Sequence, residues 1–89
     1  MAYEVDGKGN VKVFIFTVRG FYCNEETNFS MTRCFTDYAA GWDWARQEGN
    51  DWNASDKGNA FSVDYEYEWV EHSEDSLEKF YESHEEDGF

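Results

Sequence analysis

The chain has 89 residues, with 8 Phe, 6 Tyr and 4 Trp, and its 20 acidic and 7 basic residues give a net charge of −13. This length suits one small domain, residues 1–89, and the many aromatic residues exclude a disordered acidic tail. The negative charge opposes direct binding to nucleic acid and to acidic membranes, because both are themselves negative.

Nothing in the sequence indicates a membrane span or export. No run approaches the roughly 18–20 apolar residues that a spanning helix needs, and the N-terminal MAYEVDGKGN lacks the features of a signal peptide. We expect a cytoplasmic protein. Cys23 and Cys34 could face each other across a hairpin, but in such a protein they are more often two reduced thiols.

The first third of the chain predicts strands. A short strand is expected around residues 2–5, followed by a turn at DGKGN (6–10), whose residues tolerate positive φ. Residues 11–23 are the most β-prone run and are apolar on both faces, which predicts a central strand with a helix on one face and partial cover on the other. After a turn, residues 28–36 return as the next strand.

A helix is predicted over residues 37–49. Thr36 and Asp37 are both good N-caps, and Gly49 is a natural stop. Gly41 costs about 1 kcal/mol relative to Ala inside a helix, so we expect it to allow close packing on the sheet. Residues 50–59 read as a polar loop.

Residues 60–71, AFSVDYEYEWVE, alternate with a two-residue period that is typical of a strand. Three carboxylates occupy one face, about 6.6 Å apart. They are Asp64, Glu66 and Glu68. The apolar side chains of the other face are expected to be core, namely Phe61, Val63, Tyr65, Tyr67 and Trp69.

Ser73 is the predicted N-cap of a last helix over residues 74–87, and the tail from residue 84 is expected to fray. The predicted order of elements is β-β-β-α-β-α. The fold class is therefore α+β, a small antiparallel sheet of about four strands packed against one or two helices.

The sequence contains few signals for catalysis. The chain has two histidines and no nucleophile elbow, phosphate-binding loop or zinc-protease pattern, so we expect no enzyme and no cofactor. Asp51, Asn53 and Ser55 have the spacing of a calcium loop, but Asp56 replaces its glycine and Ser62 its final glutamate. No metal site is predicted.

Negative charge is concentrated in residues 60–89, which hold 11 acidic residues and one Lys. Like charges this close cost stability, which suggests a basic partner, although a plain solvated surface is the ordinary alternative. The acidic set that would contact the partner is Asp64, Glu66, Glu68, Glu71, Glu74, Asp75, Glu78 and Glu82. Exposed aromatic residues such as Trp52 or Tyr81 would anchor the contact.

With this distribution of acids over residues 62–87, the chain resembles the small phage-encoded inhibitors of host defence, the DNA-mimicking anti-CRISPR and anti-restriction proteins. The resemblance implies that carboxylates replace DNA phosphates in the basic channel of a nuclease or surveillance complex. It covers a class without a shared motif, so no residue roles are carried over. An immunity protein or antitoxin that neutralises one basic nuclease or toxin is the alternative, and a plain acidic interaction domain is another.

Overall fold

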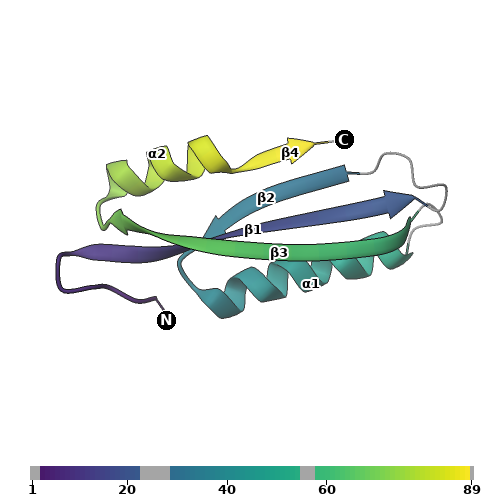
Figure 1. Ribbon diagram of the computed structural model, residues 1–89, viewed down its shortest axis with the longest axis horizontal. Coiled ribbons are helices and arrows are strands. Elements are labelled where there is room, and N and C mark those ends of the chain that lie inside the picture. The colour runs from purple at the N-terminus through teal and green to yellow at the C-terminus, as the bar shows by residue number, and fades with distance from the viewer. Residues whose placement is uncertain (1–2, 23–28, 55–57, 89) are drawn as a thin grey trace.

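The computed structural model describes residues 3–22, 29–54 and 58–88. Four strands form one antiparallel sheet in the spatial order β3-β1-β2-β4, and two helices pack on it (Figure 1). The strands are β1 (Asn10–Tyr22), β2 (Phe29–Phe35), β3 (Gly58–Glu71) and β4 (Glu86–Gly88), and the helices are α1 (Tyr38–Ala54) and α2 (Glu74–His84). The predicted α+β class is confirmed.

Strand β1 is the centre of the sheet, as its sequence predicts. It pairs with β3 on one side and β2 on the other, and it buries apolar side chains on both faces. One face carries Val11, Val13 and Ile15, and the other carries Phe14, Phe16 and Val18. Burial on both sides of β1 requires that both faces of the sheet be covered, and each helix covers one face.

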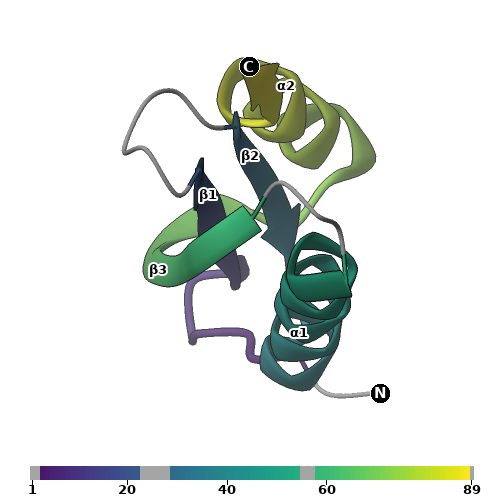
Figure 2. The same ribbon diagram turned by 90° about the vertical axis from the view of Figure 1, so that its right-hand side faces the viewer.

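The two helices lie on opposite faces of the sheet (Figure 2). On one face, α1 packs through Trp42 and Ala45 against the cluster around Phe16. On the other, α2 packs through Leu77 and Phe80 against the cluster of Val11, Val13 and Ile15. The result is an elongated molecule of 48 × 23 × 16 Å in which each helix covers part of one face.

Helix α1 begins where the sequence predicts and ends later. The Asp37 carboxylate caps it by accepting the backbone N–H of Ala39 at 3.0 Å. Gly41 lies against the Phe16 ring, where a Cβ atom would overlap the ring, which confirms its predicted packing role. The predicted stop at Gly49 is wrong. A Cβ at this buried position would lie 3.0 Å from the Phe61 ring, so the glycine allows contact with the sheet and the helix continues.

The ends of the chain differ from the predicted order. The strand expected at residues 2–5 is reduced, within the described residues, to one bridge between Val5 and Val11. The expected loop at 50–59 is helical to Ala54 and extended from Gly58. The last helix, predicted to reach residue 87, ends at His84. Residues 86–88 of the tail that was expected to fray form β4, which pairs with β2 and is held by an ion pair between Arg33 and Asp87 at 2.6 Å.

Helix α2 confirms the prediction at its start, where the Ser73 hydroxyl accepts the backbone N–H of Ser76 at 3.2 Å. Cys34 is buried beneath the helix with a free thiol. Cys23 and the turn that follows it lie outside the described residues. Burial, and then the nearby Glu85 carboxylate, raise the pKa of Cys34 to about 12.

Candidate partner-binding surface

Strand β3 is the terminal strand of the sheet, and its two faces differ in chemistry. The acidic row, Asp64, Glu66 and Glu68, lies on the face that α2 covers in part. The aromatic row, Tyr65, Tyr67 and Trp69, lies on the face of α1. The alternation follows directly from the two-residue period of a strand.

The prediction that the whole apolar face of β3 is core is wrong for the aromatic row. Tyr65, Tyr67 and Trp69 are 45%, 52% and 44% exposed, whereas Phe61 and Val63 pack against the core. The cause is the position of α1. This helix starts beside Tyr65 and runs toward Phe61, so it leaves the second half of β3 uncovered on this face.

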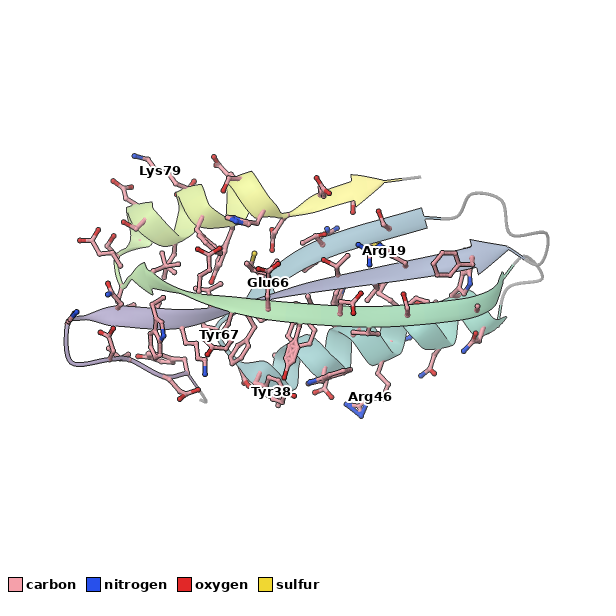
Figure 3. All side chains as sticks on the ribbon, in the orientation of Figure 1. Arg19, Tyr38, Arg46, Glu66, Tyr67 and Lys79 are labelled. Carbon is pink, nitrogen blue, oxygen red and sulfur yellow. The ribbon has the colours of Figure 1, made fainter. Side chains whose placement is uncertain are left out.

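Aromatic side chains from two other elements, β1 and α1, contact the aromatic row. Tyr65 stacks on Phe16 with ring centroids 5.3 Å apart, and Tyr38 of α1 meets Tyr65 edge to face at 5.5 Å. Tyr38 and Tyr67 lie on the same side of β3 (Figure 3). The Nζ atom of Lys12 lies 4.1 Å from the centroid of the Tyr67 ring and forms an ion pair with Glu4 at 3.6 Å. The row is thus a partly exposed aromatic surface that already contacts one cation.

The acidic row is exposed but unevenly neutralised. Asp64 forms an ion pair with Arg19 at 3.0 Å, and Glu68 lies 3.8 Å from His84, a pair that is ionic only when the imidazole is protonated. Glu66 has no ion pair among the described residues. Glu66 therefore presents the least compensated charge of the row.

The remaining members of the acidic set lie on or near α2. Leu77, Phe80 and Tyr81 face the sheet, which leaves Glu74, Asp75, Glu78 and Glu82 on exposed positions of the helix. Lys79, on the same exposed side, points away from the sheet in Figure 3. Glu71 is exposed and accepts a hydrogen bond from the Ser76 hydroxyl at 2.7 Å.

All eight carboxylates of the acidic set are therefore exposed, but they form two groups. One group follows the β3 edge and the other follows the outer side of α2. The two aromatic anchors that the sequence suggested are not exposed. Tyr81 is partly buried and packs against the core cluster beneath α2. Trp52 is half-buried, and its indole N–H donates to the Ala60 carbonyl at 3.0 Å.

Several basic side chains are held by neighbouring carboxylates. The pairs are Lys12 with Glu4, Arg19 with Asp64, Arg33 with Asp87 and Arg46 with Asp43. Each of these basic groups neutralises a nearby carboxylate, so the four do not form a basic patch. A surface of this kind attracts cations and repels phosphates.

Other kinds of site find little support in the part of the chain that is described. Within residues 3–22, 29–54 and 58–88, no group of three or more His, Cys, Asp or Glu side chains is arranged to hold a metal ion. The described helices include none with the length and apolar character needed to cross a membrane. No protein-family model, curated protein or solved structure matches the chain.

Proposed function

We propose that this protein is a stoichiometric inhibitor that occupies the nucleic-acid-binding site of a basic protein or complex. Its targets in this proposal are host defence complexes of the CRISPR or restriction type, and its source is a phage. The observation that carries the proposal is the exposure of all eight carboxylates of the acidic set. Because these groups repel one another, their accumulation on one third of a small domain favours a role in contact with a cationic surface.

The spacing of the acidic row supports the same role. Carboxylates on one face of a strand recur about every 6.6 Å, close to twice the roughly 3.4 Å axial spacing of phosphates along one DNA strand. The row can therefore offer charge to Lys and Arg side chains that are arranged for a phosphate backbone. The exposed rings of Tyr67 and Trp69 add apolar contact area to the charged contacts of the carboxylates. Large aromatic side chains supply much of the binding energy at protein interfaces.

The proposal is tested with purified CRISPR and restriction effector complexes, whose loading of labelled DNA is followed by fluorescence anisotropy. We expect the protein to block loading at a 1:1 ratio, with the block weakening as salt rises. The variant E66Q/E68Q removes two charges from the acidic row. The matched control D43N/D51N removes two exposed charges from α1 and has the same net charge.

Inhibition should fall in E66Q/E68Q and persist in D43N/D51N. If both variants inhibit as well as the wild type, the acidic row is not the contact. If both lose inhibition equally, only total charge matters and the assignment to β3 is wrong. If no effector tested loses its DNA loading in the presence of the wild-type protein, the proposed class of target is wrong.

A further inference from the structure

Strand β3, 14 residues long, lies at the edge of the sheet in the part of the chain that is described. Within the described residues, β3 pairs with β1 on one side, and no strand pairs with its other side. The opposite edge of the sheet is formed by β4, which has three residues. A long open edge offers a row of backbone donors and acceptors to another chain, and proteins usually shorten or cover such edges.

The hydrogen bonds of β1 show which backbone groups of β3 face outward. Lys12 is the pairing partner of Trp69, yet its backbone N–H donates away from β3, to the Glu4 carbonyl at 2.9 Å. Lys12 and Trp69 are therefore a non-hydrogen-bonded pair, and the N–H and C=O of Trp69 point outward. Because such pairs alternate along an antiparallel ladder, Tyr65 and Tyr67 share this orientation.

We propose that this edge accepts an antiparallel strand from the basic partner, in which Lys or Arg residues alternate with apolar residues. The inference rests on the proposed function and specifies how the contact forms. The partner's basic side chains would lie opposite the acidic row, about 4.5–5.5 Å away between Cβ atoms, and its apolar side chains opposite the aromatic row. Backbone hydrogen bonds would form at Tyr65, Tyr67 and Trp69.

Charge complementarity favours this occupant over a second copy of the chain. Two β3 edges paired in antiparallel fashion would place one acidic row beside another, and like charges directly opposite are destabilising. Each copy also carries a net charge of −13. The row that attracts a basic strand therefore also discourages self-association at the same edge.

A peptide of alternating Lys and Val, eight residues long, is the probe for wild-type protein. In the antiparallel arrangement its Val amides bond to the β3 edge and its Lys amides point away. N-methylation of the Val amides should weaken binding about tenfold, since it removes several backbone hydrogen bonds, and N-methylation of the Lys amides should change it little. A peptide with the same composition in two blocks, four Lys then four Val, should bind about tenfold more weakly than the alternating one.

Two protein variants test the edge from the other side. Y67P removes the outward N–H of residue 67, and Y67A removes the same ring but keeps the N–H. Proline is tolerated on edge strands where its missing N–H faces solvent, so Y67P should fold, which thermal unfolding verifies. We expect Y67P to bind the alternating peptide more weakly than Y67A. The N-methylated peptides remain a test if Y67P does not fold.

The pairing mode is overturned if the two N-methylated peptides bind equally, or if the blocked peptide binds as well as the alternating one, because charge alone then explains binding. A β3-mediated dimer in sedimentation velocity that Y67P abolishes would replace the basic strand with a second copy. The proposed function fails separately. If the peptides bind as expected but effector complexes load DNA normally, strand pairing at β3 is supported and the inhibitor function is wrong. If E66Q/E68Q loses inhibition but all the peptides bind equally well, the inhibitor function is supported and strand pairing is wrong.

Discussion

The ammonium group of Lys12 lies 4.1 Å from the ring centroid of Tyr67 on the neighbouring strand. The Trp69 and Phe14 rings are also close to the ammonium group, at 5.8 Å and 5.5 Å from their centroids. A cation over aromatic faces is attracted by the electron density of the rings. The aromatic row thus already contacts a cation of the protein itself.

The contribution of this contact is measurable with K12M, Y67L and the double variant. We expect an interaction free energy of about 0.5–1 kcal/mol from the double-mutant cycle, the magnitude of cation–π pairs near the surface. Urea unfolding gives the four free energies. K12R is the control, because it keeps the charge and should retain most of the interaction. An interaction free energy of zero would show that the contact between Lys12 and Tyr67 does not stabilise the protein.

Removing the charge of Glu66 and removing the charge of Asp64 should change the free energy of unfolding in opposite directions. E66Q removes a carboxylate that has no ion pair among the described residues and is repelled by its acidic neighbours, so the free energy of unfolding should rise slightly. D64N breaks the ion pair with Arg19, in which both side chains are largely exposed, and should lower it by about 0.2–1 kcal/mol. Urea unfolding at low salt measures both. The difference between the two variants in free energy of unfolding should shrink in high salt. Equal changes in the two variants would contradict this prediction.

Gly41 should tolerate no side chain. G41A places a methyl group within the Phe16 ring, which is fully buried and cannot move freely. Overpacking of this kind typically costs about 1–3 kcal/mol, which exceeds the roughly 1 kcal/mol that alanine gains in a helix. G7A is the control, since nothing lies within 4 Å of its added Cβ. If G41A unfolds at the same urea concentration as the wild type, α1 does not pack as closely as described.

The thiol of Cys34 should resist reaction and make stability depend on alkaline pH. Burial raises its pKa from 9.0 to about 12, so the folded protein retains this proton where the unfolded chain loses it. The stabilisation is complete below pH 9 and is lost progressively as pH rises toward 12. Burial also raises the pKa of Tyr81, which adds to the same trend.

A C23S background leaves Cys34 as the sole cysteine for this measurement. We expect slow labelling by a thiol reagent at pH 8 in the folded protein and fast labelling in urea. The additional substitution of Cys34 by Ala should reduce the loss of stability above pH 9. Rapid labelling under native conditions would mean that the site beneath α2 is open to solvent.

The central strand, the hairpin return and the last helix could be predicted because their signals are local. Residues 11–23 are apolar on both faces, and Ser73 precedes a helix with a clear apolar stripe. Both patterns depend on the period of one element alone. The extension of α1 past Gly49 could not be predicted, because the glycine contacts Phe61 from β3 and a tertiary contact outweighs the local stop signal.

The exposure of the candidate site was only half predictable. The acidic row was expected on the surface because buried carboxylates are rare without partners. The aromatic row was expected in the core, since alternation shows that Tyr67 and Trp69 share a face but not whether a helix covers it. Where α1 begins along the sheet decides that question. The edge position of β3 among the described strands depends on the strand order, which the alternation does not determine.

Half of the acidic set rests on α2, a helix without a fully buried residue, whereas α1 buries Gly41, Ala45 and Gly49. A weakly anchored helix opens at a lower free energy than the body of a domain. Amide hydrogens of α2 should therefore exchange with solvent faster than those of α1 or β1, which mass spectrometry measures. If the proposed cationic partner binds, the carboxylates of α2 can shift to follow its contour more readily than those of β3. A partner that holds α2 in place should slow its exchange more than that of any other element.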